Sequence, residues 1–233
     1  EKNQNQLKIK KANKYNMTTI NKYFILVISL VLSSTTFGQI RLPKLIGNGM
    51  VLQRDAKIKV WGWAAPEEKI TIDFINKKYN IKANKHGDWE LQLSHLKPGG
   101  PYTMKIAASN TIEISDIAIG DVWLCSGQSN MAMNVGQVRE LFIRNFEMPR
   151  DYEFNVQRTD VNGGSWVNAN PSTVLKFSAA AYFFVKELYA KYKIPMGMIN
   201  ASYGGTPIHA WISEEDLKPF PDSYKEIADL KNP

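Results

Sequence analysis

A serine, Ser129, lies in a segment that is half apolar and half polar, Gly120–Met131. The apolar half, which ends at Cys125, is typical of a buried parallel strand, and the polar half would form a loop at the carboxyl end of that strand. Open α/β sheets place their sites just beyond the carboxyl ends of strands. The small residues Ser126 and Gly127 keep the approach narrow enough for a substrate carbonyl to meet a serine nucleophile. We therefore take Ser129 as the candidate catalytic residue.

Two amide side chains, Gln128 and Asn130, flank this serine and are candidate substrate-binding groups. The pattern differs from the G-x-S-x-G nucleophile elbow, because Met131 stands where the second glycine would be. That difference argues against the α/β-hydrolase fold.

A serine nucleophile needs a base, usually a histidine oriented by a carboxylate, and donors for the developing oxyanion. The loop Ser202–Thr206 follows a second predicted strand, just as the Ser129 loop follows the first, so the two loops can face each other across a site. Gly204 and Gly205 in this loop expose backbone N–H groups. Alternatively, the two glycines form a tight turn and have no role as oxyanion donors.

Four separated sequence blocks resemble the sialate O-acetylesterase family, a branch of the SGNH (GDSL-like) esterases. The blocks are Arg41–Arg54, Ser126–Met131, Phe177–Phe184 and Ile199–Trp211, and the resemblance extends from about Ile40 to the last residue. The resemblance implies an SGNH-type, doubly wound, three-layer α/β domain with Ser129 as nucleophile. It implies an oxyanion hole made by the N–H of Ser129 and that of Gly204 or Gly205. It implies an acetylated sugar or glycan as substrate, with no metal and no organic cofactor.

Two motifs of the family are absent from the sequence. A block resembling Gln-Gly-Glu-Ser-Asn supplies a further oxyanion donor in the family, and Asp-x-x-His supplies the base and its partner; neither occurs here. We therefore expect an N-terminal fragment of such an enzyme, without esterase activity of its own. His209 stands where the family has a glutamate, shares a loop with the oxyanion glycines and has no evident carboxylate to orient it. His86 and His95 are expected to be exposed residues between short strands.

The aromatic residues Trp166, Tyr203 and Trp211 could form a wall for a sugar, because an apolar ring face complements a pyranose face; the alternative is packing at the sheet edge. Cys125 is the single cysteine, which excludes an intrachain disulfide and a multi-cysteine zinc site. Its position in an apolar strand predicts a small buried hydrophobic residue rather than a reactive thiol.

The pattern of short strands changes near residue 117. Residues 39–116 contain short alternating runs separated by turn signals, which predict a small antiparallel β-sandwich. Residues 117–233 predict the first part of a doubly wound sheet, with its remaining part missing. Its expected elements are a strand at 117–125, a helix at 174–192 and a strand at 196–201, with a helix and an excursion between 134 and 170.

The basic charge of the chain is concentrated in its first 38 residues. The formal net charge is +7, and this segment, with six lysines and one glutamate, contributes +5 of it. The remaining +2 forms no dense cluster, so the composition argues against a nucleic-acid partner.

Residues 1–38 resemble an export signal preceded by translated upstream sequence. Lys22 precedes the apolar run Phe24–Leu32, which is too short to span a bilayer, and small residues, Thr36 and Gly38, stand at the positions that a signal peptidase prefers. We expect a secretory signal peptide that starts at Met17, with cleavage before Gln39 and a periplasmic or extracellular product that keeps no membrane anchor. The alternative is an N-terminal anchor or a buried helix.

The sequence thus favours a serine esterase that removes O-acetyl groups from sugars, foremost a sialate O-acetylesterase. An esterase for acetylated xylan or another polysaccharide is the first alternative. The motifs identify the residues that transfer the acetyl group better than they identify the sugar alcohol from which it is removed. A non-catalytic carbohydrate-binding protein, acting through its β-sandwich, is the second.

Overall fold

The structure is a computed structural model that describes residues 39–132, 142–151, 153 and 155–231. The proposed leader, residues 1–38, lies outside the described residues, as does part of the helix expected after residue 134. Residues Gln39–Pro233 form one compact unit.

The first half of this unit is built from strands. They are β1 (Val51–Gln53), β2 (Ile58–Trp63), β3 (Lys69–Phe74), β4 (Lys77–Lys82), β5 (Asp88–Leu93), β6 (Gly99–Ala107) and β7 (Thr111–Gly127). Strands β4, β3, β6 and β7 are antiparallel neighbours in the large sheet, and β2 pairs with β5 in a separate two-stranded sheet. Alternating apolar residues give each sheet one buried face.

The two sheets share one hydrophobic core. Val60 and Leu91 of the β2–β5 pair belong to the same buried cluster as Ile72, Met104 and Ile117 of the large sheet. This arrangement brings two layers of strands together in the part of the chain where short strands were expected. The boundary proposed between residues 116 and 117 falls inside β7, and the division into domains stays a prediction.

Strand β7 connects the two halves of the fold. The last short strand of residues 39–116 and the strand at 117–125 were expected to be separate, but one 17-residue strand runs through both and passes Asp116 with a φ of 56°. Its first half pairs antiparallel with β6, and its second half pairs in parallel with β1 and then β10 (Met196–Ser202). The expectation of two strands was wrong because pairing with β6 and β10 extends β7 across the polar residues between them.

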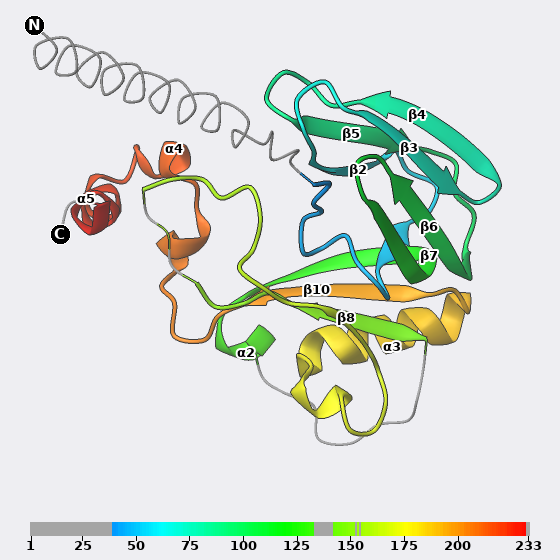
Figure 1. The fold of residues 1–233 in the computed structure, drawn as a ribbon. Helices are drawn as coiled ribbons and strands as arrows, with labels where there is room; N and C mark the ends of the chain where they lie inside the picture. Colours follow the sequence, from blue (N-terminus) through cyan, green and yellow to red (C-terminus); the bar gives the residue numbers. More distant parts are fainter. Residues whose placement is uncertain (1–38, 133–141, 152, 154, 232–233) are drawn as a thin grey trace, which may run out of the picture. The chain divides into compact units, whose positions relative to one another are not determined.

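The second half of the unit continues the large sheet with parallel strands (Figure 1). Its remaining elements are α2 (Ser129–Ala132), β8 (Ile143–Glu147), β9 (Trp166–Asn168), the 3-10 helix η1 (Val174–Lys176), and α3 (Ala179–Tyr192). Strand β10 lies between β7 and β8 and is parallel to both, while β9 closes the edge antiparallel to β8. The molecule is therefore a mixed α/β structure with a large mixed sheet.

Helix α3 covers one face of these parallel strands (Figure 1). Its N-cap is Ser178, whose Oγ accepts a hydrogen bond from the N–H of Ala181 at 3.2 Å. The helix ends at Lys193, which has a φ of 55°. The helix expected at 174–192 is thus interrupted, because Phe177 is extended and Ser178 starts a new helix. Tyr182 and Val185 pack with Met196, Met198 and Cys125 of the sheet.

Buried Arg144 of β8 fixes the parallel strands to the first half of the unit. Its side chain is 2% exposed, and it donates hydrogen bonds to the carbonyl of Gly49 and the carboxylate of Asp116, both at 2.8 Å. A buried guanidinium is tolerated when such partners satisfy it. This contact joins β8, β7 and the segment before β1.

The carboxyl half of β7 is less buried than its apolar sequence predicts. Among the described residues, the stretch from Asp121 to Gly127 pairs with β10 on one side. Cys125 is buried, but Trp123 and Leu124 are 38% and 69% exposed. The expectation of a strand buried on both faces was therefore wrong for this stretch, because no described element covers Leu124.

Three short helical elements end the described chain. They are the 3-10 helix η2 (Ile208–Trp211), α4 (Glu214–Leu217) and α5 (Pro221–Lys231). Proline at the first helical position of α5 is a common helix start, because its missing N–H needs no partner there. In the part of the chain that the structure describes, none of the helices has the length and apolar character needed to cross a bilayer.

Candidate active site

Ser129 lies at the carboxyl end of β7, as its sequence position predicts. Gly127 ends the strand with a φ of 134°, which turns the chain, and Ser129 is the first residue of α2. The serine is exposed, and its Oγ donates a hydrogen bond to the side-chain oxygen of Gln128 at 3.2 Å. Among the described residues, no histidine or carboxylate is hydrogen-bonded to this hydroxyl. Asn130 is also exposed beside it.

The loop after β10 adjoins the nucleophile loop. Parallel pairing places Ser202 opposite Gly127, and the N–H of Tyr203 donates to the Gly127 carbonyl at 2.8 Å. A Cβ built on Gly204 would lie 3.7 Å from the Oγ of Ser129. Within the described part of the chain, and apart from the chain neighbours of Gly205, no atom lies within 4 Å of a Cβ built on Gly205, whose φ is 85°. The structure therefore brings Ser129 and Gly204 together, with Gly205 one residue further on.

A buried polar network lies beneath these loops, and the sequence reasoning missed it. The hydroxyl of Ser202 donates to the Asn200 side chain at 2.7 Å, and the Asn200 amide donates to the Glu147 carboxylate at 2.9 Å. Both Ser202 and Asn200 are buried. These bonds hold the start of the Tyr203–Gly205 loop to the end of β8. The available signal was a polar residue, Asn200, inside an otherwise apolar strand.

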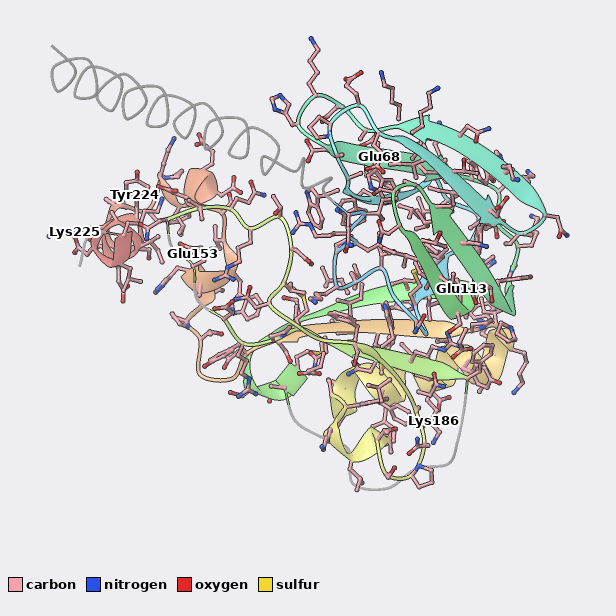
Figure 2. The ribbon with its side chains drawn as sticks, viewed as in Figure 1. Glu68, Glu113, Glu153, Lys186, Tyr224 and Lys225 are labelled. Atoms are coloured by element: carbon pink, nitrogen blue, oxygen red, sulfur yellow. The ribbon has the colours of Figure 1, made fainter. Side chains whose placement is uncertain are left out.

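A cavity of about 470 Å³, here called the loop cavity, opens on the other side of the second loop. Tyr203 and Trp211 line it, and the guanidinium of Arg150 lies 5.0 Å from the centre of the Tyr203 ring. Figure 2 labels Glu153, also in the wall, on the segment after β8 and on the side of α5. These aromatic and charged groups fit a polar ligand that also presents an apolar face.

Trp166 is not part of that cavity. Its indole N–H donates to the carbonyl of Leu45 at 2.9 Å, and its ring packs edge-on against Phe146. The three aromatic residues proposed as one sugar-binding wall therefore separate into a pair, Tyr203 and Trp211, and a packing residue, Trp166. Trp166 lies apart from the other two because it packs against Phe146 and the segment before β1.

His209 has a carboxylate partner that the sequence did not reveal. Its Nε2 lies 3.4 Å from an Oε of Glu226, which α5 supplies. Both residues line the loop cavity, whose walls do not include Ser129. His86 and His95 are exposed, as expected. Within the described ranges, no group of three or more histidine, cysteine, aspartate or glutamate side chains is placed to hold a metal ion.

Cys125 is 6% exposed and packs between β10 and α3. Burial raises the pKa of its thiol, so the reactive thiolate is rarer than in an exposed cysteine. We expect the folded protein to react with 5,5′-dithiobis(2-nitrobenzoate) at pH 8 at least about 100-fold more slowly than the guanidinium-unfolded protein. Equal rates would contradict the buried position.

The mixed α/β fold, with an exposed serine beside a glycine loop at the ends of parallel strands, is consistent with an SGNH-like carbohydrate esterase. Residues 119–229 match the family of carbohydrate esterases described as sialic acid-specific acetylesterases. The resemblance inferred from the sequence motifs is thereby confirmed.

Relatives with established names agree with this assignment. The chain is 33% identical to a sialate O-acetylesterase of Pongo abelii and 32% identical to that of Homo sapiens, over 83% of this chain in both. It spans 43% of the length of each. A solved structure of a carbohydrate acetylesterase from Xanthomonas citri superposes with a TM-score of 0.74 at 34% identity, covering 77% of this chain and 44% of that one.

Proposed function

We propose that this chain carries the nucleophile of an esterase that removes O-acetyl groups from sugars. The observation that carries the proposal is the approach of the Gly204 loop to the Oγ of Ser129 across paired strands β7 and β10. A nucleophile and backbone donors at one point are what acyl transfer requires. The relatives, which are sialate O-acetylesterases, and the structural neighbour, a carbohydrate acetylesterase, support the choice of an acetylated sugar.

The proposed reaction proceeds through an acetyl-enzyme. The Ser129 Oγ attacks the acetyl carbonyl carbon as its proton passes to a base, and the tetrahedral oxyanion accepts hydrogen bonds from the Ser129 N–H and from Gly204 or Gly205. Collapse breaks the bond to the sugar oxygen, which leaves with a proton as an alcohol. Water then attacks the acetyl group and releases acetate and the free serine. No metal or organic cofactor takes part in this scheme.

The base is the missing part of this machinery. The sequence holds no Asp-x-x-His, and the described contacts of the Ser129 Oγ give it only an amide partner, Gln128. We therefore propose that the chain is the N-terminal part of the enzyme and carries only part of its active site. Residues 39–116 would form a β-sandwich, and residues 117–233 would form the first part of a doubly wound SGNH-type domain. Residues 39–233 alone would then be inactive.

The preferred substrate is an O-acetylated sialic acid. The test uses a chimera in which the matching part of this chain replaces its counterpart in the Xanthomonas citri acetylesterase. Acetate release is measured from 9-O-acetyl-N-acetylneuraminic acid and from acetylated xylan. Faster turnover of the sialic acid supports the preferred substrate, whereas turnover of xylan alone favours a polysaccharide acetylesterase.

A non-catalytic carbohydrate-binding protein is the competing class of function. It predicts that sugar binding survives deletion of everything after Asp116. The esterase proposal predicts instead that acetate release requires Ser129, which lies beyond that point.

We also propose export to the periplasm or the cell exterior. The motivation is the apolar run Phe24–Leu32 followed by small residues up to Gly38. Mass spectrometry of the secreted or periplasmic protein should find Gln39 at the N-terminus. Retention of Met17 in that material would contradict the cleavage.

A further inference from the structure

Three adjoining cavities extend from the loop cavity to the outer face of the β2–β5 pair. A cavity of about 650 Å³ on that face, here called the tryptophan cavity, shares Trp61 and Thr159 with a middle cavity of about 400 Å³. The middle cavity in turn shares Met148, Pro149 and Asp151 with the loop cavity. Each cavity thus adjoins the next, and the row of three cavities is here called the groove.

Strand β2 presents two tryptophans to this groove. Val60 and Gly62 face the core, and alternation along the strand places Trp61 and Trp63 on the opposite face, where both are partly exposed. Arg41 lies over the Trp63 ring, 5.5 Å from its centre, and so helps to orient it. Trp61 lines both the tryptophan cavity and the middle cavity. Two neighbouring indoles on one strand are therefore available to stack on successive ligand rings.

A third tryptophan, Trp89 of β5, lies opposite Gly62 on the core-facing side of the β2–β5 pair. It is 3% exposed, and within the described chain its indole N–H has no hydrogen-bond partner. A Cβ at Gly62 would lie 2.8 Å from the Trp89 ring, so glycine is what allows the indole to pack there. Trp89 therefore packs in the core beneath β2, where it supports the strand that carries Trp61 and Trp63.

The charged side chains of the tryptophan cavity balance one another, since its wall holds two lysines, Lys59 and Lys82, and two carboxylates, Asp88 and Glu90. Lys59 bonds to Glu90 at 2.7 Å there, and Arg158 bonds to Asp151 at 2.6 Å in the middle cavity. The tryptophan cavity therefore offers aromatic faces and polar groups without an excess of either charge. That combination matches a ligand with many hydroxyl groups and no net charge.

We propose that this groove binds a neutral oligosaccharide, whose sugar rings stack on Trp61 and Trp63 and whose chain continues past Thr159 toward the Tyr203 loop. The inference rests on the proposed function for the carbohydrate nature of the ligand. It goes beyond that function by assigning a binding site to β2 and β5, far in sequence from Ser129. The acetylated sugar would then be one residue of a longer glycan held by its unmodified part.

The experiment measures binding of non-acetylated glycans to the 233-residue chain by titration calorimetry. The probes are xylohexaose, cellohexaose and mannohexaose, with the matching disaccharides for the effect of length. At least one hexasaccharide should bind, more tightly than its disaccharide, because more rings contact the groove. Trp61→Ala should weaken that binding about tenfold or more, as expected when a central aromatic contact is lost.

The matched control is Trp123→Ala, which removes another partly exposed indole from a strand outside the groove and should leave binding unchanged. If Trp61→Ala does not fold by circular dichroism, Thr159→Arg serves instead, because Thr159 is exposed and a large side chain there would block the path. Binding of no hexasaccharide, equal loss in both tryptophan variants, or stronger binding of an α2,8-linked sialic acid trimer would overturn the proposal. The probes carry no acetyl group, so the binding result does not depend on whether Ser129 is a nucleophile.

Discussion

Alanine at Ser129 is expected to lower acetate release by the chimera at least about 10³-fold, because the covalent step loses its nucleophile. The structure gives this residue the exposed position at the end of β7 and the neighbouring glycine loop that acyl transfer needs. The fold should be unaffected, since the hydrogen bond described for this hydroxyl goes only to the exposed side chain of Gln128. Acetate release and circular dichroism of the same samples provide the two readouts.

Ser126→Ala is the matched control for this substitution. Ser126 is also exposed and lies three residues earlier, but it belongs to β7 itself and pairs with Ala201. Alternation along the strand directs it away from the face on which Cys125 packs against α3. We expect less than about a tenfold loss for Ser126→Ala. Similar losses for both serines, or an active Ser129→Ala enzyme, would mean that the nucleophile is another residue.

Residues 39–233 by themselves are expected to show negligible esterase activity. Without a base to take the Ser129 proton, the general-base contribution of about 10²- to 10⁴-fold is lost, and loss of one member of a catalytic set removes most of the effect of the others. Exposed Trp123 and Leu124 on the open part of β7 should also bind a hydrophobic dye. The assay compares acetate release from an acetyl ester with the uncatalysed rate.

His209 is the residue that could contradict this expectation. The structure supplies the carboxylate partner, Glu226, that the sequence did not reveal. The pair nevertheless lies in the loop cavity, whose walls do not include Ser129. Robust hydrolysis by residues 39–233 that His209→Ala abolishes would make His209 the base. Hydrolysis at the uncatalysed rate, both by residues 39–233 and by their His209→Ala variant, would support the expectation that His209 is not the base.

The sequence predicted the elements that position the candidate site. Apolar runs followed by small polar loops located the ends of β7 and β10, and the expectation that their loops face each other agrees with the position of Gly204 beside Ser129. This succeeded because neighbouring parallel strands end at the same edge of a sheet. The roles of the two residues in catalysis stay predictions.

Other elements could not be predicted because tertiary contacts determine them. Strand β8 contains Arg144 and Asn145, which interrupt an apolar pattern, and the bonds of Arg144 to Gly49 and Asp116 are what make its burial tolerable. The pairing that merges two expected strands into β7 is also a long-range effect. Similarly, α5 brings Glu226 to His209 from 17 residues further along the chain.

Mapping the acetylated residue tests the central claim most directly. The chimera is mixed with an acetyl ester, quenched in acid within the first turnover, digested and analysed by mass spectrometry. The account predicts that the added mass of one acetyl group lies on Ser129, and that Ser129→Ala enzyme carries none. Acetylation of Ser126, Cys125 or Ser202 in place of Ser129, or turnover without any acetylated residue, would contradict it.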